Sequence, residues 1–268
     1  MTIAGVWALH VSFERHDAQV GGWGLVTVSP STRFVLVEDK ADVEFYSAVR
    51  DILTDYGPSR DERAIKPAPS LVFLPASLRS GNAKVGGGSA VVTQWVEKFD
   101  QAPLNEVIRG VTDRDTGNIA SSRVLVLDRY SIENYLLDPF VVFALMLDEG
   151  TALPVVGVSI SAGDEHLIRS LDIAELTAIL NQIHLRVEAV LPDIVAADVE
   201  SRDVAFTNGK VVQYAAWMLD RRGHDLLPIY QSLFGGARVI SPPRLEKAFR
   251  RVRLIPSYLA NIMDRLQA

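Results

Sequence analysis

The sequence predicts an α/β fold, with a parallel sheet flanked by helices and followed by a mainly helical C-terminal extension. Two observations predict the class. In the first half, short runs of apolar residues, which are typical of fully buried strands, alternate with stretches in which apolar residues recur at helical spacing. After Leu127, such runs become scarce and amphipathic stretches dominate. The chain has 268 residues, which is long enough to bury a large core without disulfides or a structural metal.

The elements of the first half follow from apolar spacing and turn residues. The run FVLV is short and β-branched, and the apolar residues after it recur at helical spacing. A glycine-rich turn at 86–88 precedes a further helix, whose inner face is expected to be Val91, Trp95 and Val96. The predicted elements are, in order, strand 34–37, helix 41–53, strand 71–74, helix 90–99, strand 107–111 and strand 124–127.

In the second half the pattern predicts helices. A short helix is expected over 131–137, and Asp138 with Pro139 is typical of the N-cap and first turn of the next helix, which continues through 140–147. Further amphipathic stretches cover 168–191, 211–219 and 244–253. We therefore divide the chain into an N-terminal extension packed on the core (1–30), an α/β core (31–130) and a helical C-terminal region (131–268).

Composition excludes several classes of function. The formal net charge is −6, so bulk electrostatics do not favour a polyanion, and nucleic-acid contact must be local. The absence of cysteine excludes thiolate metal sites and cysteine nucleophiles, and it fits the reducing cytoplasm. The N-terminus lacks a basic leader, so no signal peptide is expected. The longest apolar run, 140–147, is far below the ~20 residues that a membrane span needs, so no membrane association is expected.

Acidic residues follow two of the predicted strands. Glu38 and Asp39 come after the first strand, and Asp113 and Asp115 come after the third. Ligands of open α/β sheets gather outside the carboxyl ends of the strands, so these side chains are expected on one edge. Carboxylate oxygens are the ligands that Mg²⁺ and Mn²⁺ prefer. The pattern therefore indicates a metal site.

The spacing of these acids allows two ions. Asp113 and Asp115 are two residues apart and face the same way in an extended segment, whereas Glu38 and Asp42 are four apart across a strand-to-helix turn. Two ions about 3.5–4 Å apart can activate water and hold the leaving oxygen of a phosphodiester. The alternative is structural, because Asp39 and Asp42 also suit the first turn of a helix, where acidic residues complement the helix dipole.

These residues carry a resemblance to a known family. The stretch VLVEDKADVEFY resembles the first motif of TOPRIM domains, and GVTDRD resembles the second. Asp42 matches the extra ligand of the overcoming-lysogenization-defect (OLD) branch. The segments SIENYLLDP, PASLRSGNAKVGGGSAVVTQWV and NGK are similar to an OLD-like TOPRIM family often encoded beside an ABC-type ATPase, to which the effector nuclease of the PARIS anti-phage system belongs. The resemblance covers roughly residues 34–210.

The resemblance implies roles for individual residues. Glu38 would be the catalytic carboxylate, and Asp42, Asp113 and Asp115 would be metal ligands that serve catalysis. Lys210 would contact a phosphate or the transition state, although a solvated lysine beside an Asn-Gly hairpin turn is the alternative. Glu133 would be a further metal ligand or a helix-capping residue.

A local basic patch lies near the C-terminus. Residues 238–253 carry six cations and one glutamate, and Arg244, Lys247 and Arg251 share a face if the segment is helical. Such a face suits phosphate contacts with nucleic acid, and the alternative is a solvated helix surface.

The combined expectation is a nuclease that uses Mg²⁺ or Mn²⁺, with two ions, to hydrolyse RNA such as tRNA, or DNA. The resemblance implies a toxic effector of anti-phage defence that an ABC-type ATPase partner controls and that forms a homodimer when active. The alternative is a non-catalytic TOPRIM-like module that binds the ATPase or a nucleotide. Asp39 favours this alternative, because TOPRIM domains usually have glycine directly after the glutamate.

Overall fold

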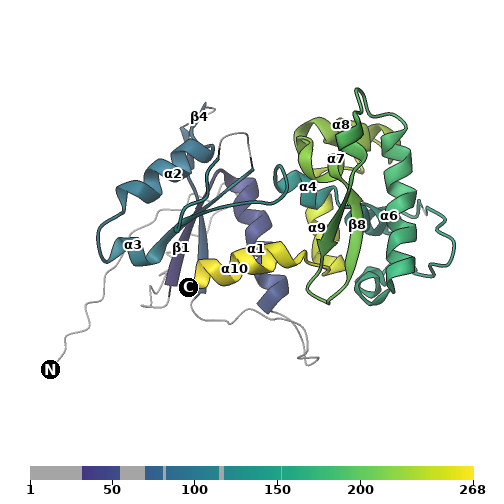
Figure 1. Cartoon of the computed structure of the whole chain (residues 1–268), viewed down its shortest axis with the longest axis horizontal. Helices are drawn as coiled ribbons and strands as arrows, with labels where there is room; N and C mark the ends of the chain where they lie inside the picture. The colour runs from purple at the N-terminus through teal and green to yellow at the C-terminus, as the bar shows by residue number, and fades with distance from the viewer. Residues whose placement is uncertain (1–31, 55–69, 81–82, 115–117, 152) are drawn as a thin grey trace, which may run out of the picture.

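The computed structural model describes residues 32–54, 70–80, 83–114, 118–151 and 153–268. The fold is the expected α/β class, with a four-stranded parallel sheet, flanking helices and helices at the C-terminus (Figure 1). The predicted N-terminal extension, residues 1–30, and the candidate ligand Asp115 lie outside the described residues.

The first half of the chain builds the sheet. Its elements are β1 (Thr32–Val37), α1 (Lys40–Thr54), β2 (Ser70–Pro75), β3 (Ser77–Ser80), β4 (Ala83–Gly86), α2 (Ser89–Lys98), α3 (Leu104–Val107), β5 (Ile108–Thr112) and β6 (Val124–Val126). The sheet order is β2-β1-β5-β6, and each neighbouring pair is parallel. The four predicted strands are therefore confirmed, with ends that differ by at most two residues. Strands β3 and β4 form a separate antiparallel pair.

Strand β1 contributes to both faces of the sheet. Val35 and Val37 are fully buried in the main core, whereas Leu36 packs with Val92 and Val96 of α2 in a smaller cluster. Because successive side chains of a strand point to opposite faces, α2 covers the face opposite to the main core.

The buried face of helix α2 differs from the prediction. Its buried residues are Val92 and Val96, while Trp95, expected inside, is 43% exposed. The helix lies against Gly110 of β5, where an added Cβ would be 2.8 Å from Val92 Cγ1. The absence of a side chain at Gly110 lets the helix approach the sheet, and this close approach selects which side of α2 faces inward.

The second half is mainly helical and contains one hairpin. Its elements are α4 (Ile132–Leu136), α5 (Pro139–Asp148), η1 (Glu165–Ser170), α6 (Ile173–Glu188), η2 (Ala196–Val199), β7 (Ser201–Ala205), β8 (Val211–Ala215), α7 (Ala216–Asp220), α8 (Gly223–Leu233), α9 (Pro242–Val252) and α10 (Ser257–Gln267). The predicted N-cap of α5 is present, because the Asp138 carboxylate accepts a hydrogen bond from Phe140 N. Ser131, expected inside the short helix 131–137, is the N-cap that precedes α4.

The prediction of a helix over 211–219 was wrong for its first half. Residues 211–215 form β8, which pairs with β7 across a turn in which Gly209 has φ +81°. A glycine adopts this left-handed backbone without strain, and Val211 and Val212 suit a strand. The helix begins at Ala216. The predicted helical stretch 168–191 is also divided, because η1 ends at Ser170 and Asp172 caps α6.

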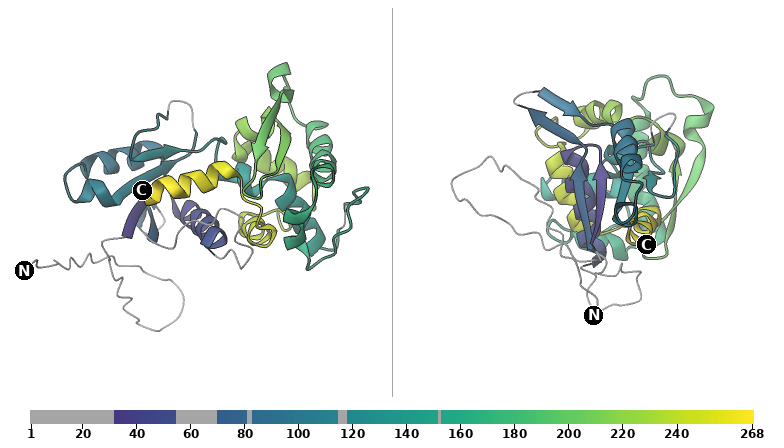
Figure 2. Two further views of the ribbon diagram at one scale, coloured as in Figure 1. Left: turned by 60° about the horizontal axis from the view of Figure 1, so that its bottom comes forward. Right: turned by 90° about the vertical axis from the view of Figure 1, so that its left-hand side faces the viewer.

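The C-terminal helices complete the α/β core. Helix α10 contacts β1, β2 and α1, and α9 contacts α1, so segments far apart in sequence lie side by side (Figure 2). One hydrophobic cluster contains residues of both halves, including Val35 of β1 and Leu259 of α10.

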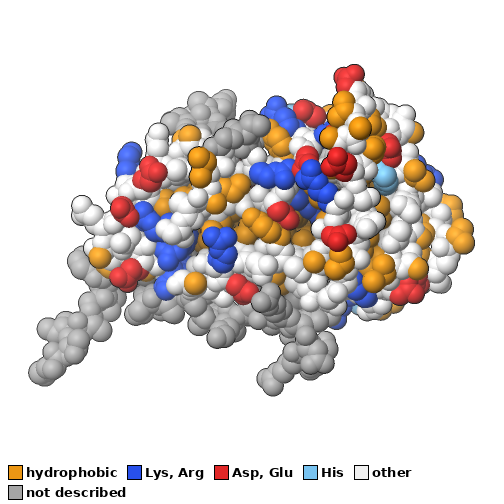
Figure 3. All heavy atoms as spheres, viewed as in Figure 1, with side chains coloured by type: hydrophobic (Ala, Val, Ile, Leu, Met, Phe, Trp, Pro, Cys, Tyr) orange, Lys and Arg blue, Asp and Glu red, His pale blue; other side chains and the backbone are white. Residues whose placement is uncertain are grey.

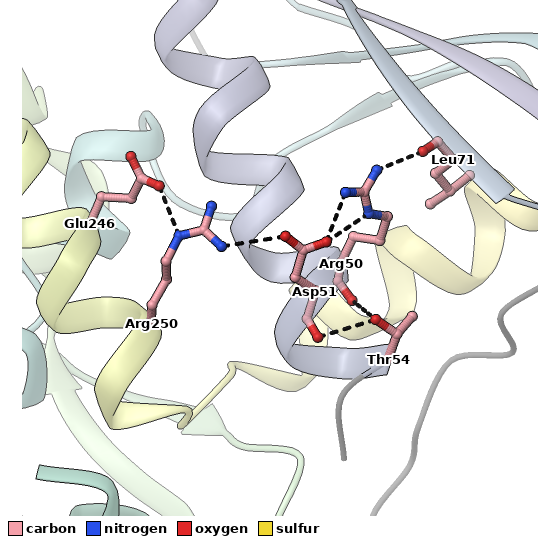
Figure 4. A network of polar contacts seen from close by, with 6 residues as sticks. All are labelled: Arg50, Asp51, Thr54, Leu71, Glu246 and Arg250. Carbon is pink, nitrogen blue, oxygen red and sulfur yellow. Dashed lines mark hydrogen bonds and ion pairs between the residues drawn. The ribbon is translucent and has the colours of Figure 1, made fainter. Parts of the chain in front are cut away.

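A polar network also joins the halves. Arg250 of α9 donates to Asp51 of α1 (3.4 Å) and to Glu246 (3.0 Å), while Arg50 donates to the other oxygen of Asp51 and to the carbonyl of Leu71 (Figure 4). The network ties α9 to α1 and β2.

Candidate metal site at the carboxyl edge of the sheet

The strand order reverses between β1 and β5. From β1 the chain continues to β2 on one side, and it later returns to β5 on the other side of β1. In open α/β sheets, ligands bind outside the carboxyl ends of the strands at this reversal. Glu38 directly follows β1, and Asp113 directly follows β5. The topology therefore places two of the predicted carboxylates where such folds bind ligands.

A hydrogen bond joins these two residues. The backbone N–H of Asp113 donates to Glu38 Oε1 at 3.3 Å, although the residues are 75 positions apart. Asn118 Nδ2 donates to the Asp113 carbonyl at 2.8 Å. This hydrogen bond holds Asn118 next to the residue that directly follows β5. The prediction that Glu38 and Asp113 share one edge is confirmed.

Asp42 lies in the first turn of α1 beside Glu38. The Asp39 carboxylate accepts from Ala41 N and the Asp42 carboxylate accepts from Asp39 N, each at 2.8 Å. Asp39 therefore caps the second residue of α1, and Asp42 binds back to the N-cap N–H, so the structural alternative for Asp39 and Asp42 is borne out. The negative charges of Glu38 and Glu133 nevertheless act on the Asp42 carboxyl.

The environment of Asp42 favours its neutral form. Burial raises the pKa of Asp42 to about 8, and the negative charges of Asp39, Glu38 and Glu133 add to this effect, while the Asp39 N–H opposes it. A buried carboxyl among like charges is the arrangement that a divalent cation reverses, because the cation stabilises the ionised form.

Tyr46 lies one helical turn beyond Asp42. It is fully buried, and burial together with the charges of Asp42, Asp113 and Glu38 raises its pKa well above the usual range. The Tyr46 hydroxyl therefore stays protonated and neutral near the carboxylates.

Glu133 reaches the same region from α4. Asn134 fixes this helix: its Oδ1 accepts from Ser131 N, and its Nδ2 donates to the carbonyls of Met218 and Arg221. The helix thus carries Glu133 close enough to influence the Asp42 carboxyl. The remaining members of the ENYLLDP segment also hold this part of the fold together, which gives the motif a structural role.

Asp128 is a residue that sequence reasoning missed. It follows β6, and its carboxylate accepts a hydrogen bond from the Tyr135 hydroxyl. The signal was present, because Asp128 is the first polar residue after the run VLVL, as Glu38 is after FVLV. Carboxylates therefore follow three neighbouring strands of the sheet.

A buried ion pair lies next to the end of β6. Arg129 is 1% exposed and pairs with Asp138 at 3.0 Å, and its guanidinium lies 4.6 Å from the centre of the Tyr135 ring. The Tyr214 hydroxyl of β8 donates to the same aspartate. This cluster joins the end of β6 to α5 and to the hairpin.

Lys210 is placed differently from the expectation. Its ammonium donates to the carbonyls of Arg169 (3.0 Å) and Leu171. The Asn-Gly turn is confirmed, but the lysine is not simply solvated beside it. Among the described residues, none of the acids at the sheet edge is a hydrogen-bond partner of this ammonium.

Arg244, Lys247 and Arg251 of α9 do share a face, as expected, and their charges form ion pairs within the fold. Arg251 and Lys247 pair with Asp148 at 2.6 and 3.8 Å, and Arg244 pairs with Glu149. The hydrogen bond from Arg251 holds the pKa of Asp148 below its usual range. The face is therefore an ion-paired contact with the end of α5.

The donor set fits a hard divalent cation in its chemistry. Glu38, Asp42, Asp113 and Glu133 offer carboxylate oxygens, which Mg²⁺ and Mn²⁺ prefer. In the part of the chain that the structure describes, which leaves out Asp115, no three acidic or histidine side chains already form a group able to hold a metal ion. The structure thus brings the carboxylates to one edge without a complete coordination shell.

Comparison of the chain with protein-family models, with curated proteins and with solved structures finds no match. None of the helices in the described part of the chain combines the length and apolar character that crossing a membrane requires.

Proposed function

We propose that this chain is a nuclease that uses Mg²⁺ or Mn²⁺ to hydrolyse phosphodiester bonds of RNA, such as tRNA, or of DNA. The observation that supports this most is the contact between Asp113 N and Glu38 Oε1 at the reversal of strand order. It joins two carboxylate-bearing strand ends at the position where α/β sheets bind ligands.

The residues of the chain have distinct parts in this proposal. Glu38 and Asp113, with Asp42 and Glu133, would hold the cation, and Asp115 follows closely enough in sequence to join them. The bound metal would lower the pKa of a water molecule and stabilise charge on the phosphate. Asp42 would give up its proton when the cation binds, and neutral Tyr46 would keep the floor of the site uncharged.

The biological part of the proposal rests on the resemblance in the sequence. An OLD-like TOPRIM effector encoded with an ABC-type ATPase would be restrained by that partner and released on infection, pairing as a homodimer. Co-purification of the chain with the neighbouring ATPase tests this part. Absence of association under native conditions would contradict it.

The cleavage activity is tested directly. The wild-type chain and the variants Glu38→Gln and Asp113→Asn are incubated with total RNA and plasmid DNA, with Mg²⁺, Mn²⁺ or chelator. The proposal predicts metal-dependent products from the wild type and a loss of roughly 100-fold or more in each variant. Asp164→Asn, an exposed aspartate remote in sequence from these ligands, is the matched control and should cleave normally.

A second candidate is a non-catalytic module that binds the ATPase or a nucleotide. The incomplete ligand group within the described residues and the capping role of Asp39 favour it. On this candidate, Glu38→Gln would bind the partner as the wild type does, and neither protein would cleave nucleic acid even when the partner is present.

A further inference from the structure

Arginine side chains flank the acidic edge on the side of β5. Arg114 directly follows Asp113, and its guanidinium donates to the carbonyl of Leu219 (3.3 Å) and pairs with Asp220. Asp220 also pairs with Arg202 of β7 at 2.8 Å. One carboxylate is therefore shared by two arginines, which leaves a net positive charge next to Asp113.

A second arginine flanks the edge on the side of Glu133. Helix α8 begins at Gly223, where an added Cβ would lie 2.4 Å from Glu133 Cβ, so the helix starts directly against that residue. Arg222 precedes Gly223 and is exposed. Its guanidinium makes no ion pair or hydrogen bond within the described ranges, so its charge is available to a ligand.

The phosphate backbone of a nucleic acid needs cations near the acidic edge in order to bind there. The protein carries a net charge of −6, and the carboxylates of the edge repel phosphates unless cations lie close by. Arg244, Lys247 and Arg251 pair instead with Asp148 and Glu149 at the carboxyl end of α5. Lys and Arg side chains, with acidic side chains among them, also gather near the middle of the face shown in Figure 3.

We propose that Arg114, next to Asp113, and Arg222, next to the start of α8 against Glu133, bind backbone phosphates of nucleic acid and so position the strand at the acidic edge. The inference rests on the proposed nuclease function and adds the residues that hold the substrate. Both are positioning residues, since they would contact phosphates beside the one that reacts.

Binding without cleavage tests this. Fluorescein-labelled single-stranded and duplex RNA and DNA are titrated with the full-length chain in chelator, at several salt concentrations between about 50 and 200 mM. Arg222→Gln should weaken binding several-fold and reduce the slope of log K against log salt by about 0.7–0.9, the loss of one phosphate contact. Arg222→Lys should restore most of the slope.

Matched variants separate charge from folding. Arg186→Gln removes an exposed arginine from the last turn of α6 and should leave binding unchanged. Arg114→Gln should weaken binding, whereas Asp220→Asn breaks the same ion pair but keeps Arg114, and should leave binding unchanged or tighter.

The outcomes are distinct. Equal affinities and salt slopes for the wild type, Arg222→Gln and Arg114→Gln would overturn the inference while leaving metal-dependent cleavage intact. A wild-type chain that binds none of the probes would overturn the inference, and the cleavage assay would then decide the proposed function separately.

Discussion

Asp42 occupies an environment in which its neighbours disfavour a charge. It is 7% exposed and lies among Asp39, Glu38 and Glu133, and its pKa is raised to about 8. The same side chain caps α1 through the Asp39 N–H. The residue thus contributes a structural bond and also makes the edge sensitive to protons and cations.

The raised pKa predicts a pH dependence of stability in metal-free protein. Unfolded Asp42 ionises near pH 4, whereas folded Asp42 keeps its proton up to about pH 8, so the folded state binds more protons between these values. The free energy of unfolding should therefore fall as pH rises from 5 to 8, by at most about 1.4 kcal/mol per pH unit from this group. Urea unfolding in chelator measures it.

Asp42→Asn isolates this contribution, because it keeps a side-chain acceptor for the Asp39 N–H but does not titrate. Its free energy of unfolding should depend less on pH than that of the wild type, and the gap between the two should widen in its favour toward pH 8. Parallel pH profiles would contradict the account.

Single residues also show where sequence reasoning succeeds. Glu38 and Asp113 could be predicted, because each is the first acidic residue after an apolar strand. Asp128 obeys the same rule, but no second acid lies within two residues after it, as Asp39 follows Glu38 and Asp115 follows Asp113. The contacts of Lys210 could not be predicted, since they join residues about forty positions apart.

At the scale of elements, the fit between α2 and β5 depends on one glycine. Adding a methyl group at Gly110 would bring a carbon within 2.8 Å of Val92 and 3.1 Å of Val96. Gly110→Ala should destabilise the protein by about 1–3 kcal/mol through overpacking, measured by denaturant unfolding.

A double variant tests whether overpacking against Val92 causes this loss of stability. In Val92→Ala the space beside Gly110 is open, so adding Gly110→Ala should cost much less than it does in the wild type, or nothing. Additive costs for the two substitutions would show that the close approach is not the cause.

The elements that sequence predicted well are those set by local signals. The four sheet strands, the cap of α5 and the helix α9 follow from apolar runs and capping residues within a few positions. The inner face of α2 depends on Gly110, and β8 depends on pairing with β7. Both are tertiary contacts, which override helical spacing.

At the scale of the whole molecule, two ion pairs between different elements lie in different surroundings. Arg129 and Asp138 are both buried, whereas Asp51, which pairs with Arg250, has a side chain that is 48% exposed. Asp138→Ala should cost about 3–5 kcal/mol, because it leaves a buried guanidinium unpaired, and Asp51→Ala should cost less than about 1 kcal/mol. Chemical denaturation of both variants measures this, and equal costs would contradict it.

The arrangement of the whole molecule was predictable only in part. Alternating apolar runs predicted a parallel sheet, but the order β2-β1-β5-β6 and the packing of α10 on β1 join residues that are far apart in sequence. The reversal of strand order between β1 and β5, which brings Glu38 next to Asp113, therefore could not be predicted from the sequence and is seen only in the three-dimensional structure.

The proposed function requires that the carboxylates at this reversal bind a divalent cation. The most direct measurement is calorimetric titration of Mn²⁺ into metal-free wild type, Glu38→Gln and Asp113→Asn, in two buffers of different ionisation enthalpy, with Asp164→Asn as control.

The account predicts saturable binding by the wild type and the control, with proton release from Asp42 near neutral pH, and a loss of at least about tenfold in affinity in the other two variants. Wild type that binds no Mn²⁺, or binding that Glu38→Gln and Asp113→Asn leave unchanged, would contradict it.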